Sequence, residues 1–175
     1  MRLFIAFRVP SEPLLSLQQK LPQEGLKFVH DFHCTLKFLG EIASENVQEV
    51  IDRLRTITFS PFTLHFDQVG CFPTLRSPRV IWVGLSPAHP VVELQHQIED
   101  ALESMFTREE RFAPHVTLGR VKSVKVKKQV QHALQHMQTP SAGFVLKEFL
   151  LMKSALKRSG PVYTLVEQFG CGSAE

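Results

Sequence analysis

The sequence predicts an α+β or α/β domain built as two similar halves, each with its own β-sheet. Three observations carry this prediction. Hydrophobic periodicity alternates between strand-like and helix-like segments, and the order β-α-β-α-β occurs twice. Each half contains one segment of the form His-x-Thr-Leu, and the two histidines are 82 residues apart. No Gly/Ser/Pro-rich linker separates the halves, which favours one compact unit over two tethered domains.

The first half begins with an expected strand at residues 3–9 and a helix from about Pro13 to Leu21. A strand around His33 follows. We expect the next helix to have Ser44 as its N-cap, and the half to end in a strand at residues 62–70. The apolar stripe of that second helix consists of Val47, Val50, Ile51, Leu54 and Ile57.

The second half repeats this order after residues 71–79, whose two prolines predict a loop. A strand at residues 79–85 precedes a helix that starts at Pro90. A strand around His115, a further helix, and strands at residues 144–154 and 162–169 complete the half. The two helices are expected to bury Val91, Leu94, Ile98, Leu102 and Met105, and Val130, Ala133, Leu134 and Met137, respectively.

The repeated His-x-Thr motif is the main indication of function. Side chains alternate along a strand, so His33 and Thr35 share one face, as do His115 and Thr117. If the halves face each other about a pseudo-twofold axis, both motifs line one cleft. Two imidazoles there could supply the acid and the base of a phosphodiester displacement, while the threonine hydroxyls bind the phosphate.

Two basic residues near the motifs are candidates for binding the same phosphate. Lys37 has the parity of His33 and Thr35, and we expect it at the rim of the cleft. Arg120 has the opposite parity from His115. Its guanidinium would reach the site only if the strand bulges or ends, and Gly119 makes a bulge plausible.

Composition is that of an ordinary globular protein, with 175 residues of which 43% are hydrophobic. Charge is unevenly distributed: residues 111–158 contain ten Lys or Arg and one acid, Glu148, or +9, whereas the rest carries −6. The densest part, residues 120–128, is interpreted as a half-buried strand and its exit loop. This segment suits a phosphate-bearing partner, and the alternative is an edge strand protected by lysines.

Cysteine usage and the absence of long apolar segments restrict the cellular setting. Cys34, Cys71 and Cys171 form no Cys-x-x-Cys pair, which favours a reducing cytoplasm over a disulfide framework or a thiolate zinc site. The apolar start of the chain is interrupted by Arg8, and no run approaches 18 apolar residues. We therefore expect no membrane association.

Other residues with possible roles are weaker candidates. His132 and His136 have a spacing that could bind metal but lack the Glu of the His-Glu-x-x-His pattern, so no metal site is predicted. Parity places His30 on the face opposite His33. Tyr163 could stack on a base or ribose, or simply close the last strand.

Four segments together resemble a known family: MRLFIAF, FHCTLKFLGE, RFAPHVTLGR and LMKSALKRSGPVYTLVEQF. The chain resembles the 2H phosphoesterase superfamily over nearly its whole length, and specifically the LigT-like branch of RNA 2′,3′-cyclic phosphodiesterases. The resemblance implies a single domain over residues 1–175 with a bilobal α+β fold and a central cleft. Each lobe would contain an antiparallel-rich sheet with helices outside, the lobes being interleaved or divided near residue 75.

The resemblance also implies an activity and roles for residues. A terminal RNA 2′,3′-cyclic phosphate would be hydrolysed to a 2′-phosphate, with His33 as proton donor and His115 as proton acceptor. RNA ends are the expected partners, no cofactor is expected, the protein would be a monomer, and 2′-5′ ligation in vitro is implied. Two alternatives remain open: a phosphodiesterase for another cyclic nucleotide-type substrate, and a non-catalytic RNA-binding module that uses the basic segment.

Overall fold

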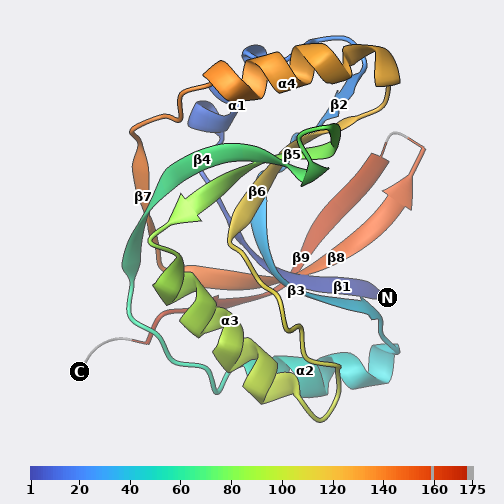
Figure 1. The fold of residues 1–175 in the computed structure, drawn as a ribbon. Helices are drawn as coiled ribbons and strands as arrows, with labels where there is room; N and C mark the ends of the chain where they lie inside the picture. The colour runs from blue at the N-terminus through green and yellow to red at the C-terminus, as the bar shows by residue number, and fades with distance from the viewer. Residues whose placement is uncertain (159, 173–175) are drawn as a thin grey trace.

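The computed structural model describes residues 1–158 and 160–172, and within them the chain forms two antiparallel β-sheets (Figure 1). One has four strands in the order β3-β1-β8-β9, and the other has five in the order β2-β6-β5-β4-β7. The first consists of β3 (His33–Glu41), β1 (Arg2–Arg8), β8 (Glu148–Lys157) and β9 (Gly160–Gly170). The second consists of β2 (Leu26–Phe28), β6 (His115–Val121), β5 (Ser77–Ser86), β4 (Phe62–Thr74) and β7 (Gly143–Leu146).

The two halves of the sequence exchange strands between these sheets. Strand β4 belongs to the first half but pairs with β5, and β8 belongs to the second half but pairs with β1. One buried apolar cluster accordingly includes residues from Leu3 to Phe169. The predicted α+β fold with a sheet in each lobe is confirmed, and the exchange makes each motif strand part of a sheet completed by the other half.

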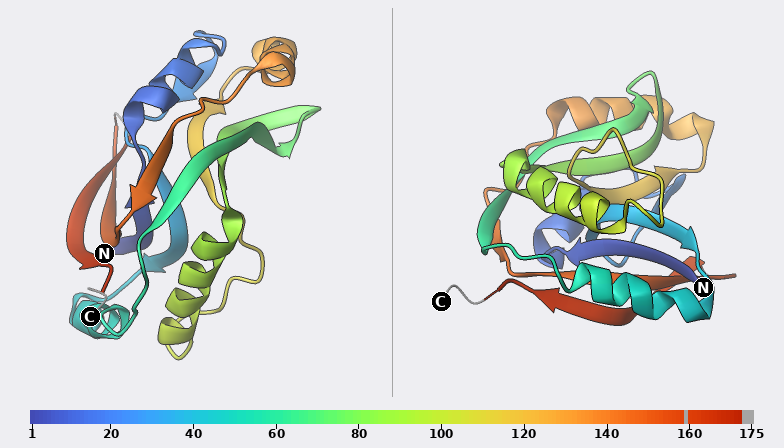
Figure 2. Two further views of the ribbon diagram at one scale, coloured as in Figure 1. Left: turned by 90° about the vertical axis from the view of Figure 1, so that its left-hand side faces the viewer. Right: turned by 90° about the horizontal axis from the view of Figure 1, so that it is seen from below.

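Helices cover the outer faces of both sheets in two pairs (Figures 1 and 2). Helices α1 (Ser11–Gln19) and α4 (Lys127–His136) pack against β6 and β5 of the five-stranded sheet. Helix α3 (Ala88–Leu102) packs against β3 of the four-stranded sheet and against α2 (Val47–Leu54). The inner faces of the sheets are therefore left to form the cleft.

The expected buried faces of these helices are only partly found. In α3, Val91, Leu94, Ile98 and Leu102 are buried as predicted. In α4 only Val130 is buried. Ser44 makes no side-chain cap bond, because it is itself the first residue of a 3-10 turn, Ser44–Asn46, that leads into α2.

Two predicted segments have a different structure. Residues 144–154 are not one strand: the chain leaves the five-stranded sheet after β7 and enters the four-stranded sheet as β8. Residues 71–79 are not a loop either, because β4 runs to Thr74 and β5 starts at Ser77. Pro73 and Pro78 pair with each other near the end of this hairpin, where the missing N–H groups interrupt little of the ladder.

The basic segment 120–128 also departs from its predicted strand. Only Arg120 and Val121 belong to β6, which lies between β2 and β5 and is not an edge strand. The hydroxyl of Ser123 accepts a hydrogen bond from the backbone N–H of Lys125 and caps the 3-10 turn Val124–Val126. Helix α4 then begins at Lys127, so the lysines lie on helical turns and the edge-strand alternative is wrong.

Candidate active site

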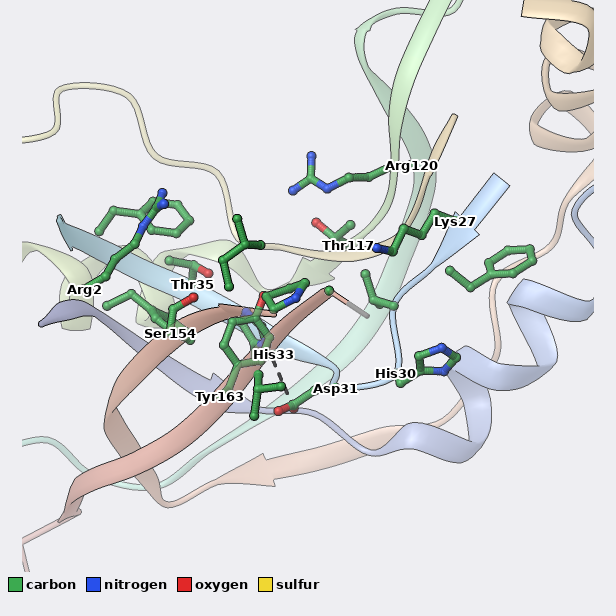
Figure 3. Close-up of a pocket in the computed structure, with 18 of the residues that line it drawn as sticks. Arg2, Lys27, His30, Asp31, His33, Thr35, Thr117, Arg120, Ser154 and Tyr163 are labelled. Carbon is green, nitrogen blue, oxygen red and sulfur yellow. Dashed lines mark ion pairs between the residues drawn. The ribbon is translucent and has the colours of Figure 1, made fainter. Parts of the chain in front are cut away.

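The two His-x-Thr motifs come together at one cavity of about 750 Å³ between the sheets (Figure 3). His33 and Thr35 line it from β3, and His115 and Thr117 line it from β6. The Cys34 thiol, buried behind the first motif, has a hydrogen bond with the backbone of His115, while burial raises the pKa of this thiol to about 12. The starts of the two motif strands are thus in direct contact.

Both motif strands carry a β-bulge at the same place, immediately after the threonine. In β3, Thr35 pairs with Ala6 and Lys37 pairs with Ile5, which leaves Leu36 as the extra residue. In β6, Leu118 is the extra residue, since Thr117 pairs with Trp82 and Gly119 pairs with Ile81. A bulge shifts the alternation of side chains by one position, so residues after it face the opposite way from their sequence parity.

The bulges determine whether the two basic candidates, Arg120 and Lys37, line the cavity. Arg120 lines the cavity, as a bulge next to Gly119 would require. Lys37 does not line the cavity, so the prediction that it lies at the rim of the cleft is wrong. The bulge at Leu36 turns its side chain into the core, and the residue is 2% exposed. Its Nζ donates to Oε2 of Glu99 at 2.6 Å and to the backbone carbonyl of Thr107 at 2.9 Å.

Phe38 occupies on the first wall the position that Arg120 has on the second, three residues after the threonine. It lines the cavity and is 70% exposed. The sequence did not indicate this position, because regular alternation places Phe38 on the face opposite His33 and Thr35, and only the bulge reverses that.

Three further cations in the cavity lining were also missed: Arg2, Lys27 and Lys122. Lys27 lies on β2, a strand of three residues that periodicity did not reveal. His30 lines the cavity too, contrary to its expected orientation, because it precedes β3 in a loop where strand alternation does not apply. Figure 3 shows Lys27 and Arg120 on the same side as Thr117, and Arg2 near Thr35.

Hydrogen bonds orient both imidazoles. His115 Nδ1 lies 2.8 Å from the carbonyl oxygen of Ala113. A carbonyl can only accept, so Nδ1 carries the hydrogen and Nε2 of the neutral ring keeps its lone pair. The His33 ring has a hydrogen bond with the backbone of Asp31, and its Nδ1 lies 4.0 Å from Oδ1 of that residue. Burial lowers the pKa of His33, and the Asp31 carboxylate and the backbone bond oppose that effect.

Aromatic rings hold each imidazole from the side. The Tyr163 ring meets His33 edge to face at a centroid distance of 5.1 Å, and Phe4 lies 5.2 Å away. On the other wall, Phe72 lies 5.2 Å from His115. Burial, and then Asp31, raises the pKa of Tyr163, so its hydroxyl stays protonated near neutral pH. Tyr163 therefore lines the site as a neutral group packed against His33.

Other possible sites are not supported among the described residues. Within residues 1–158 and 160–172, no three His, Cys, Asp or Glu side chains are grouped so as to hold a metal ion. His132 and His136 lie on α4 with their ring centroids 4.4 Å apart, and neither residue lines the cavity. In the same part of the chain, no helix is both long and apolar enough to cross a membrane.

Paired histidines and threonines on two facing walls, surrounded by cations, are the arrangement expected of a two-histidine phosphoesterase. The family model of LigT-like phosphoesterases matches residues 8–82 and 83–163, one copy for each motif. The chain therefore belongs to the LigT-like phosphoesterase family, and its resemblance to that family is confirmed.

Individual relatives agree over almost the full chain. The chain is 31% identical to an RNA 2′,3′-cyclic phosphodiesterase of Methanocaldococcus jannaschii, over 97% of this chain and 100% of the relative. The crystal structure of TT0787 of Thermus thermophilus superposes with a TM-score of 0.80, at 28% identity and covering 97% of each chain. That of Escherichia coli LigT complexed with 3′-AMP gives a TM-score of 0.77, at 27% identity and covering 97% of each chain.

Proposed function

We propose that the protein is an RNA 2′,3′-cyclic phosphodiesterase that opens a terminal cyclic phosphate to a 2′-phosphate. The observation that carries this proposal is the presence of both His-x-Thr pairs in one cation-lined cavity. The name of the M. jannaschii relative and the 3′-AMP bound to E. coli LigT support a substrate of this kind. The two imidazoles suffice for both proton transfers, so no step needs a metal.

His115 is proposed as the general base. Its Nδ1 hydrogen is engaged by Ala113, which leaves Nε2 to accept a proton from water. The water oxygen then attacks phosphorus and forms the new P–O bond. Imidazole is suited to this step because its proton exchange falls near neutral pH.

His33 is proposed as the general acid on the opposite wall. As the bond between phosphorus and the 3′ oxygen breaks, His33 gives that oxygen a proton, and a 3′-hydroxyl and a 2′-phosphate result. The burial that lowers the His33 pKa also makes its protonated ring a stronger acid. Family resemblance, rather than the near-symmetric geometry, supports this order of the roles.

The hydroxyl groups and cations are proposed to bind the phosphate. Thr35 and Thr117 would donate hydrogen bonds to its non-bridging oxygens from the two sides, and the guanidinium of Arg120 would stabilise charge that develops during attack. Lys27 and Lys122 extend the positive lining, which suits the backbone of an RNA end. A binding module would not need paired, oriented imidazoles, which argues against the non-catalytic alternative.

Two finer points follow from the same chemistry. If a 5′-hydroxyl replaces water as the attacking group, the product is a 2′-5′ phosphodiester, so we propose ligation as a side reaction. The three cysteines are free, which supports our placing the enzyme in a reducing cytoplasm.

The proposal is tested with purified protein, excess chelator and 2′,3′-cyclic AMP. We expect full activity in chelator and a loss of about 10²–10⁴-fold in each of His33→Ala and His115→Ala. His89→Ala, on an exposed helix position, is the matched control and should retain activity. Dependence on added metal, or full activity in either motif variant, would contradict the mechanism, and a 3′-phosphate product would contradict the assigned direction of cleavage.

A further inference from the structure

The two walls differ in the residue that lies two positions before each histidine. Each ring is hydrogen-bonded to the backbone two residues before it, at Asp31 for His33 and at Ala113 for His115. The side chain at that position is a carboxylate on the first wall and a methyl group on the second. Figure 3 marks the ion pair between Asp31 and His33.

Asp31 is the only carboxylate among the described residues that line the cavity. Its Oδ1 lies 4.0 Å from Nδ1 of His33, so its charge favours a proton on that ring. The other titratable or charged groups of the lining are neutral or cationic, and the cations oppose a charge on His33. They are Arg2 of β1, Lys27 of β2, Tyr163 of β9, His115 and Arg120 of β6, with Lys122 directly after that strand and His30 before β3.

We propose that Asp31 is a positioning residue that favours the protonated form of His33 and so makes it the acid of the pair. This inference rests on the proposed function. Asp31 acts through His33 and not on the substrate. Of the two imidazoles, only that of His33 has a carboxylate two residues before it in the chain.

The direction of the effect on pH dependence follows from the role of His33. An acid must be protonated, so kcat/KM falls as pH rises through the pKa of His33 in the free enzyme. Burial lowers this pKa and Asp31 opposes the lowering. Removing the carboxylate therefore moves the falling limb to lower pH. If His33 were the base, the rising limb would move instead, and the variant would gain activity in acid.

Asp31→Asn is the variant of choice, because it removes the charge while keeping the shape and the backbone bond. NMR titration of the imidazole resonances in the free protein reads the proton on His33 without any reference to activity. We expect the His33 midpoint and the falling limb of kcat/KM to move to lower pH together. On that limb activity falls about fivefold or more, as expected for one charge 4.0 Å from a largely buried ring.

The outcomes separate this inference from the function on which it rests. An unmoved His33 midpoint overturns the proposal about Asp31, whatever the activity. A moved midpoint with an unmoved falling limb shows that His33 is not the acid, and overturns the proposed roles instead.

Ala113→Asp is the matched variant on the other wall, at an exposed position. It places a carboxylate beside the proposed base and should move the rising limb to higher pH while leaving the falling limb in place. A shift of the falling limb in this variant would contradict the assignment of one limb to each wall.

Discussion

The two walls of the cleft share a backbone and differ in side chains. Each supplies a histidine, a threonine on the same face and a bulge directly after it. The positions that differ include three pairs with contrasting chemistry, namely Asp31 and Ala113, Lys37 and Gly119, and Phe38 and Arg120. The duplication thus explains why there are two imidazoles at equivalent places. Under the proposed mechanism, the unlike residues would give one wall the acid and the other wall the arginine that binds the phosphate.

The comparison of Lys37 with Gly119 gives the largest expected effect, which is on the stability of the fold. Both follow the bulge and are buried, but only Lys37 brings a charge, which is paired with Glu99. Lys37→Met would leave the Glu99 carboxylate buried without its cation. We expect it to lower the free energy of unfolding by about 3–5 kcal/mol, measured by chemical denaturation.

Lys153→Met is the control for this prediction, since Lys153 lies exposed on β8 and should change stability by no more than about 0.5 kcal/mol. Equal stability of the two variants would show that the Lys37–Glu99 pair contributes nothing to joining β3 and α3.

Arg120 and Phe38 give the next comparison, which concerns catalysis and not folding. Arg120→Ala should reduce kcat/KM about 10²–10³-fold, because a guanidinium facing the phosphate acts mainly on the charge of the transition state. Phe38→Ala should cost about tenfold, mostly in KM, if its exposed ring stacks on the base of the substrate.

A substrate without a base separates these two effects. With the cyclic phosphate of ribose alone, the loss in Arg120→Ala should persist while the loss in Phe38→Ala disappears. If both losses persist, Phe38 does not contact the base, and if both disappear, Arg120 is not at the phosphate.

Strand alternation was sufficient to predict which face the four motif residues share. His33, Thr35, His115 and Thr117 all precede the bulges, so their parity gives the correct face. Gly119 was a usable sign of the second bulge and led to Arg120. Nothing comparable marks Leu36, because every residue around it is compatible with a regular strand, and Lys37 was therefore placed on the wrong face.

The path of the chain between the sheets was less predictable for a related reason. Residues 144–154 form one largely apolar segment, yet its two parts, on either side of Lys147, belong to different sheets. A run of apolar residues indicates that a segment is buried, but it does not indicate which element the segment packs against. Likewise, His30 and Asp31 lie in the loop before β3, where no periodicity applies, so their places in the cavity needed the structure.

The central proposal is that His33 on one wall is the acid and His115 on the other wall is the base. Its most direct test uses a 2′,3′-cyclic phosphate in which sulfur replaces the 3′ oxygen. A thiolate leaves without a proton, because a thiol is a far stronger acid than an alcohol. We predict that His33→Ala approaches wild-type activity on this substrate, whereas His115→Ala remains impaired about 10²-fold or more. Rescue of His115→Ala, or of neither variant, would contradict the assignment of His33 as the acid and His115 as the base.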